Sequence, residues 1–202
     1  FARADWFNMI GKNKEVTAEY ARLLTLYPNA KWVSKIEHNY FERIANMQYG
    51  PQGGNAILDK YGVNKGLFKD MIKQDQDNAF AWWMSAKISY MQGEMGNAVF
   101  ALKQTQESGA NYVMDKGMVD YSDEDFTGIR IYRNSILSLL PKGTKVFLTV
   151  GDKEIELKID ISDNGISTNG HMAQISKKTM QKLVVGGQLV NGIVEMEIEL
   201  AD

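Results

Sequence analysis

The stretch 81-AWWMSAKISYMQGEMGNAVFALKQT-105 decides the fold of the first part of this chain. Apolar and small side chains recur at helical spacing on both sides of a break at residues 93–96 (GEMG). Breaks of this kind end helices, and the spacing on either side is that of a helix rather than a strand. The sequence therefore predicts two helices, over residues 79–92 and 97–107, that pack as a hairpin.

The residues before this hairpin have the same helical character. Residues 15–26 (EVTAEYARLLTL) place apolar side chains on one face of a helix, which Pro28 ends. A second helix is predicted over residues 29–47, and two shorter ones over residues 56–61 and 67–72. The first part of the chain is therefore expected to be helical.

An internal repeat connects these helices. Residues 44–48 (IANMQ) match residues 88–92 (ISYMQ), and after the turn residues 54–58 (GNAIL) match residues 96–100 (GNAVF). Each unit is a helix ending in Met-Gln, a glycine-rich turn, and a second helix that opens with Asn and Ala. Asn97 and its counterpart suit the N-cap, where an Asn side chain accepts a backbone N–H. The pattern predicts a repeated helical hairpin.

The second copy, residues 79–107, resembles a tetratricopeptide repeat. Trp82 lies near the start of the first helix, Gly93 at the turn and Ala98 on the second helix, at a spacing similar to the family pattern. Residues 30–61 resemble the repeat more loosely, because their turn is longer and no Trp or Ala occupies the early positions. The resemblance implies helical hairpins that bind a peptide or another subunit on a concave face and rarely carry chemistry themselves.

The hydrophobic period changes to two at Thr144. Residues 145–150 and 154–161 alternate apolar and polar side chains around a Gly-Asp-Lys turn, which predicts a β-hairpin. Further strands are expected over residues 172–175 and 193–200, with a short helix between them. Four short strands would leave open sheet edges, where another subunit could add a strand.

A connecting helix is predicted between the two parts, over residues 122–142. Ser122 would cap it, the acidic residues that follow suit its first turn, and Pro141 would end it. The fold class is therefore expected to be α+β: a helical-hairpin region over residues 1–121, the connecting helix, and a small β-rich domain over residues 143–202.

Composition narrows the range of functions. A net charge of −2 gives no surplus of Lys and Arg for binding phosphates, so no nucleic-acid partner is expected. The absence of cysteine excludes disulfides, thiol catalysis and cysteine-ligated zinc. No apolar run approaches the roughly 20 residues that a membrane-spanning helix needs. The compartment is left open.

Candidate catalytic residues are few. The two histidines, His38 and His171, lack the spacing of a metal motif, so no metal or cofactor site is predicted. Glu37 and Glu42, followed by the Gly-rich residues 49–55, loosely resemble helical cell-wall glycan hydrolases or lyases, which need a carboxylic acid in an apolar pocket. No specific motif supports such a site, and the chain is not expected to be an enzyme.

The leading hypothesis is a non-enzymatic interaction or scaffold protein that binds a protein partner or copies of itself. Trp82 or Trp83, with Tyr90 and Phe100, are predicted to lie near that contact or in the core that supports it. An alternative is a structural subunit of a large assembly such as a virion or a secretion apparatus, which open strand edges and missing cysteine would suit. A glycan hydrolase or lyase is the third hypothesis.

Overall fold

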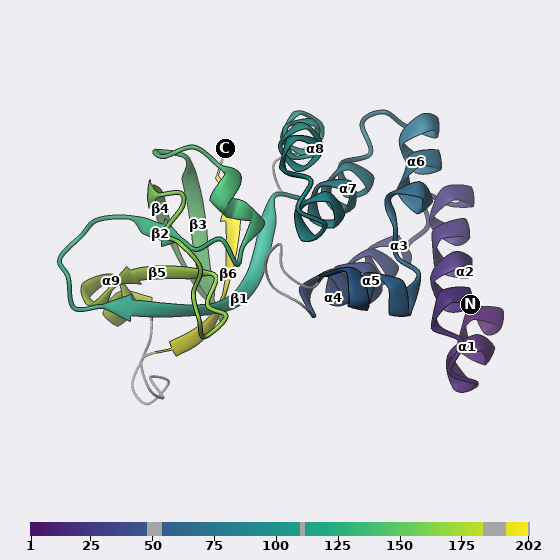
Figure 1. Ribbon diagram of the computed structural model, residues 1–202, viewed down its shortest axis with the longest axis horizontal. Helices are drawn as coiled ribbons and strands as arrows, with labels where there is room; N and C mark the ends of the chain where they lie inside the picture. Colours follow the sequence, from purple (N-terminus) through teal and green to yellow (C-terminus); the bar gives the residue numbers. More distant parts are fainter. Residues whose placement is uncertain (48–53, 110–111, 184–192, 202) are drawn as a thin grey trace. The chain divides into compact units, whose positions relative to one another are not determined.

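The structure is a computed structural model that describes residues 1–47, 54–109, 112–183 and 193–201. The chain divides into two compact units, residues 1–108 and 109–202 (Figure 1). The first is helical, and the second is a small β-barrel, so the α+β class is confirmed. The helical unit ends earlier than the predicted residue 121, because the first strand of the barrel begins at Met114.

The helices of unit 1 are, in chain order, α1 (Ala2–Met9), α2 (Asn13–Leu26), α3 (Val33–Ile36), the π-helical η1 (Glu37–Glu42), α4 (Arg43–Asn46), α5 (Gly54–Tyr61), α6 (Lys65–Gln74), α7 (Ala79–Met91) and α8 (Met95–Ser108). The elements α3, η1 and α4 form one continuous helical segment, residues 33–46, because the backbone stays helical through both junctions. Among the described residues, none of these helices has the length and apolar character needed to cross a bilayer.

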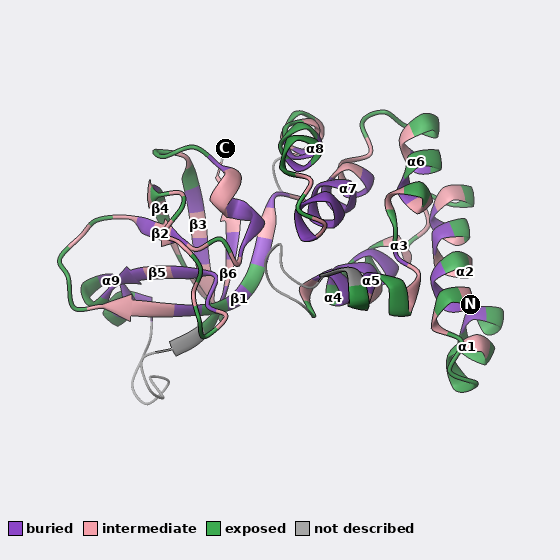
Figure 2. Ribbon diagram, in the orientation of Figure 1, coloured by how far each residue is buried: buried purple, intermediate pink, exposed green. Residues whose placement is uncertain are grey.

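Helix α7 lies at the centre of unit 1. Eleven of its thirteen residues are buried, and Figure 2 shows burial around most of its circumference. A helix that is apolar all round is a core helix rather than a surface one. The Asn78 side chain caps it by accepting the backbone N–H of Ala81 at 2.9 Å. Helix α8 begins at Met95, so Asn97 lies in its first turn and is not the predicted N-cap residue.

Three phenylalanine rings connect α7 to its neighbours. Phe41 of η1, Phe68 of α6 and Phe80 of α7 pack edge to face, with ring centroids between 5.3 and 6.2 Å apart. Each of these side chains is almost fully buried. Edge-to-face pairs add to the stabilisation that burial alone provides, so this cluster fixes the segment 33–46 against the core.

The barrel of unit 2 is built from β1 (Met114–Ser122), β2 (Ile129–Ile131), β3 (Lys145–Val150), β4 (Lys153–Ile161), β5 (Ala173–Ser176) and β6 (Ile193–Leu200), with the 3₁₀-helix η3 (Ile136–Leu139) and helix α9 (Lys177–Leu183). The strands follow the order β1-β5-β2-β4-β3-β6, and β6 pairs with β1 to close the ring. Pairs β1–β5 and β2–β4 are parallel, and the other pairs are antiparallel.

Closure corrects the expectation of open strand edges. The predicted hairpin and final strand are present as β3, β4 and β6, but β1 and β2 were not predicted. With these two added, the described strands form a closed ring, which has no edge for another subunit to extend. The interior is filled by side chains such as Ile131, Leu148 and Ile198, which are fully buried.

The predicted connecting helix over residues 122–142 is wrong. All of these residues are described, and they form the end of β1, strand β2 and the 3₁₀-helix η3. The Ser122 hydroxyl accepts the backbone N–H of Glu124 at 3.1 Å and so closes a turn rather than capping a helix. Gly128 then adopts a φ of +99°, which an α-helix does not contain. Strand β1 was missed because two of its inward positions are Asp115 and Gly117, which hide the apolar alternation.

We expect Gly128→Ala to destabilise the barrel by more than about 2 kcal/mol, because the new Cβ would lie 2.4 Å from the carbonyl oxygen of Lys158 at a positive φ. Gly151→Ala is the matched control: its φ is +61° and nothing lies within 4 Å, so only about 1 kcal/mol should be lost. Hydrogen exchange of barrel amides at increasing urea concentration measures the free energy of unfolding of both variants. Equal losses in the two variants would contradict a steric requirement at position 128.

Candidate functional site

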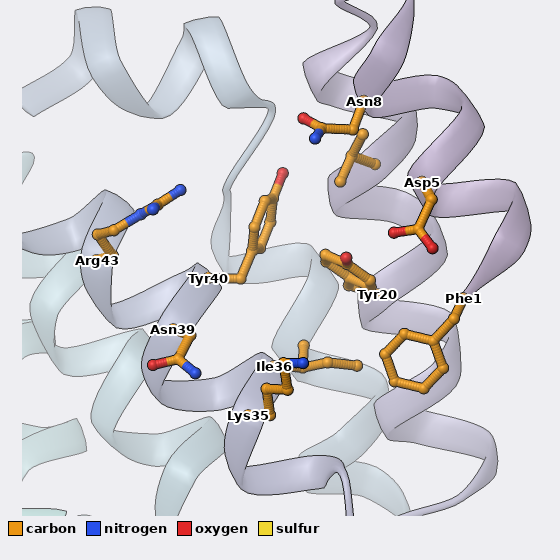
Figure 3. A pocket seen from close by; sticks show the side chains of 10 residues that line it. Phe1, Asp5, Asn8, Tyr20, Lys35, Ile36, Asn39, Tyr40 and Arg43 are labelled. Carbon is orange, nitrogen blue, oxygen red and sulfur yellow. The ribbon is translucent and has the colours of Figure 1, made fainter.

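An open pocket of about 320 Å³ lies among three helical elements of unit 1 (Figure 3). Its lining residues are Phe1, Asp5 and Asn8 from the α1 region, Val16 and Tyr20 from α2, and Lys35, Ile36, Asn39, Tyr40 and Arg43 from the segment 33–46. On each element these residues are one turn apart, so each helix presents one face to the pocket. The pocket thus has an apolar and aromatic floor and polar walls.

The π-helical turn aligns the basic wall of the pocket. An α-helix turns by about 100° per residue, so Lys35 and Arg43, eight positions apart, would differ by about 80° around its axis. The π-helical turn at Glu37–Glu42 takes up one extra residue, which turns the following residues back by about 100° and leaves the two side chains within about 20°. Figure 3 shows Lys35, Asn39 and Arg43 along one side of the pocket.

The buried hydroxyl of Thr17 holds Tyr40 in place at the floor of the pocket. Thr17 Oγ1 of α2 donates to the carbonyl of Tyr61 at 2.6 Å and accepts from the Tyr40 hydroxyl at 2.8 Å. The Tyr40 ring packs edge to face on Tyr20, with centroids 4.8 Å apart. Tyr40 is therefore held at both its ring and its hydroxyl. The Tyr20 hydroxyl makes no hydrogen bond to the described residues, which leaves it available to a ligand.

Both floor hydroxyls remain protonated at neutral pH. Burial raises the pKa of the Tyr20 hydroxyl above its ordinary value of 10.0, and the Asp5 carboxylate raises it further. Burial also raises the pKa of Tyr40, against the opposing effect of its hydrogen bond with Thr17. Tyr20 can therefore donate a hydrogen bond to a carbonyl or carboxylate oxygen.

The charged side chains at the rim of the pocket are exposed and make no ion pairs within the described part of the chain. Lys35 and Arg43 lie on one wall and Asp5 on the other, all three exposed. None of the three forms an ion pair with any residue that the structure describes, although neighbouring charges such as Arg3 and Glu19 do. The pocket therefore carries a net positive charge and can attract an anionic group.

The same segment carries the two predicted carboxylates, which do not line the pocket. Glu37 and Glu42 are each only 8% exposed. Glu42 Oε2 lies 3.2 Å from Nδ1 of His38, whereas Oε1 is buried with no hydrogen-bond partner in the described part of the chain. A buried carboxylate oxygen without a partner is costly and therefore calls for an explanation.

Further polar contacts connect this part of the segment to α7. Lys87 Nζ reaches Oδ1 of Asn46, one turn after Glu42, at 2.5 Å, and lies 5.0 Å above the ring of Trp83. Trp83 is fully buried, and its Nε1 has no partner among the residues described. These polar contacts lie outside the lining of the pocket.

The four residues predicted to lie near a contact fall into two pairs. Trp83 and Tyr90 are buried in α7 and belong to the core. Trp82 and Phe100 pack edge to face at 5.8 Å, and Phe100 is 58% exposed. Trp82 Nε1 also donates to the carbonyl of Gln76 at 2.8 Å. The structure brings Trp82 and Phe100 together on the surface, away from the pocket-lining residues.

His171 lies in the loop just before β5, and its side chain is buried. Its Nδ1 lies 3.1 Å from Oδ2 of Asp120, and the Tyr132 hydroxyl donates to the same oxygen at 3.5 Å. Burial raises the pKa of Tyr132, and the charge of Asp120 adds to the effect. These bonds tie β1 to the ends of β2 and β5, whereas Oδ1 of Asp120 is buried with no hydrogen-bond partner among the described residues.

Comparison with known proteins does not assign a function to this chain. Within the described ranges no group of three or more His, Cys, Asp or Glu side chains could hold a metal ion. The chain matches no protein-family model, no curated protein and no solved structure. The pocket of unit 1 is therefore the site from which a function is argued.

Sequence reasoning did not single out this pocket. Tyr20 and Tyr40 fall within the helices predicted over residues 15–26 and 29–47, and neither is a predicted site residue. Lys35, Asn39 and Arg43 recur every four residues and so share a broad polar face of the predicted helix, but such a face is most often simply solvated and did not indicate a pocket. Asp5 lies on α1, which was not predicted as a helix.

We expect Tyr40→Phe to destabilise unit 1 by about 1 kcal/mol, because it removes the bond to Thr17 and leaves the ring in place. Tyr20→Phe should change the free energy of unfolding by much less, since its hydroxyl has no partner among the described residues. Urea unfolding followed by tryptophan fluorescence tests this, because all four tryptophans belong to unit 1. The same loss in both variants would show that the Thr17 bond does not hold the floor.

Proposed function

We propose that this chain is a non-enzymatic binding protein whose helical unit holds a segment of a protein partner in the pocket of Figure 3. The observation that carries the proposal is an open pocket whose charged walls have no ion-pair partners within the described chain. Pockets with an apolar floor and a few polar groups at the rim are the usual form of a binding site.

The construction of the pocket favours binding over catalysis. Its titratable wall residues, Lys35, Arg43 and Asp5, are exposed, whereas general acids and bases work from desolvated positions. The aromatic floor offers contact area with little conformational freedom to lose, because Tyr40 is already held by Thr17 and Tyr20. Rigid aromatic residues of this kind dominate binding energies at protein interfaces.

Selection from a displayed library of random peptides tests this proposal. Peptides enriched on the purified chain should bind in solution, and Tyr20→Ala should weaken them about tenfold or more, as truncation of an interface aromatic does. Tyr27→Ala is the matched control, because Tyr27 is an exposed tyrosine just beyond α2 that does not line the pocket. Fluorescence anisotropy gives the affinities. The proposal fails if no peptide is enriched, or if both substitutions have the same effect.

Glycan cleavage by Glu42 is a second candidate function with one supporting observation. Its Oε1 is buried and without a partner in the described part of the chain, and His38 contacts the other oxygen. A carboxylic acid in an apolar pocket is the group that glycan hydrolases use as general acid.

Release of soluble fragments from purified peptidoglycan tests the second candidate. If Glu42 is the general acid, the unmodified chain releases fragments and Glu42→Gln lowers the rate by about 100-fold or more. Glu107→Gln, at an exposed position on α8, should leave the rate unchanged. A chain that releases nothing, or a Glu42→Gln variant as active as the unmodified chain, eliminates this candidate.

A further inference from the structure

We propose that the pocket selects an extended peptide segment with the pattern acidic–x–apolar–x–acidic, its two carboxylates facing Lys35 and Arg43 and its central side chain lying over Tyr20. This inference rests on the proposed function and names the chemistry of the partner. Carboxylates are the natural counterpart of these two side chains, because both are cationic and neither has an ion-pair partner among the residues described.

The spacing of the two cations sets the spacing of the two acids. Lys35 and Arg43 are eight residues apart, but the π-helical turn takes up one of them, so the two side chains start about 10 Å apart along the wall. In an extended chain, residues i and i+4 lie on the same side and are about 13 Å apart. Acidic residues at i and i+4 can therefore face the two cations, because the long Lys and Arg side chains cover the remaining difference of about 3 Å. Asn39, midway between the cations, can bond the peptide backbone.

The centre of the pocket disfavours a third acid. Residue i+2 of the segment lies on the same side as i and i+4, and it would face the floor made by Tyr20, Tyr40 and Ile36. Asp5 lies close enough to Tyr20 for its charge to act on the tyrosine hydroxyl. A carboxylate at i+2 would meet both an apolar surface and a like charge, whereas an apolar side chain would bury its surface there.

The polar side chains of the walls favour an extended segment over a helix, because a helix satisfies its backbone N–H and C=O groups internally. An extended strand instead presents its backbone N–H and C=O groups sideways. Asp5 and Asn8 on α1 and Asn39 on the opposite wall supply side-chain partners for them.

Fluorescein-labelled Glu-Ser-Leu-Ser-Glu, blocked at both ends, is the probe for this inference, with affinity measured by anisotropy. Lys35→Gln and Arg43→Gln should each weaken binding about threefold and together about tenfold, the size expected for exposed ion pairs. Lys103→Gln on α8 is the control and should have no effect. Glu-Ser-Glu-Ser-Glu should bind more weakly than the probe, and Asp5→Asn should reduce that difference.

Two outcomes overturn the inference, and they differ from failure of the proposed function. Equal binding of the probe and the rearranged peptide Glu-Glu-Leu-Ser-Ser would show that charge alone is recognised and the register is wrong. Loss of binding in the Lys103→Gln control as large as in Lys35→Gln would place the peptide elsewhere. If library peptides bind in a Tyr20-dependent way but acidic ones are not preferred, the proposed function stands and this inference falls. If no peptide binds, both fall.

Discussion

The buried hydroxyl of Thr17 joins three parts of unit 1 that are far apart in sequence. It lies on α2, donates to the carbonyl of Tyr61 at the end of α5, and accepts from Tyr40 in the π-helical turn. The Thr17 side chain is only 1% exposed, and hydrogen bonds from which water is excluded are stronger than those at the surface. This one group therefore joins the segment 33–46 to α2 and α5 beside the pocket.

Periodicity predicted the elements whose packing is simple. Helices α2, α7 and α8 and strands β3, β4 and β6 lie close to their expected bounds, because each buries one face or, for α7, almost all of its surface. Strand β1 could not be found in this way, since Asp115 and Gly117 occupy its inward positions. Asp115 is tolerated there because its carboxylate accepts the Ser135 hydroxyl at 2.7 Å. Without β1 and β2, a closed barrel could not be deduced.

The candidate site was harder to predict than the fold because it depends on a departure from regular geometry. Spacing rules for an α-helix leave Lys35 and Arg43 about 80° apart, at the two sides of one face, and nothing in residues 37–42 marks the π-helical turn that brings them closer. Sequence reasoning instead selected Trp82, Trp83, Tyr90 and Phe100, which are conspicuous by size. The structure divides that set between the core and the surface. The predicted carboxylates, Glu37 and Glu42, share the segment with the pocket but do not line it.

Closure of the barrel has a consequence for the order in which the two units fold. Strand β1 begins at Met114 and pairs with β6, whose last residue is Leu200, so most of unit 2 must be synthesised before the ring can form. Contacts between residues so far apart in sequence form slowly. The hairpins of unit 1, such as α7 with α8, join neighbouring segments and can form early. During synthesis the helical unit can therefore fold first, while strand β1 still has an unpaired edge. At this stage the chain is most exposed to association with other chains.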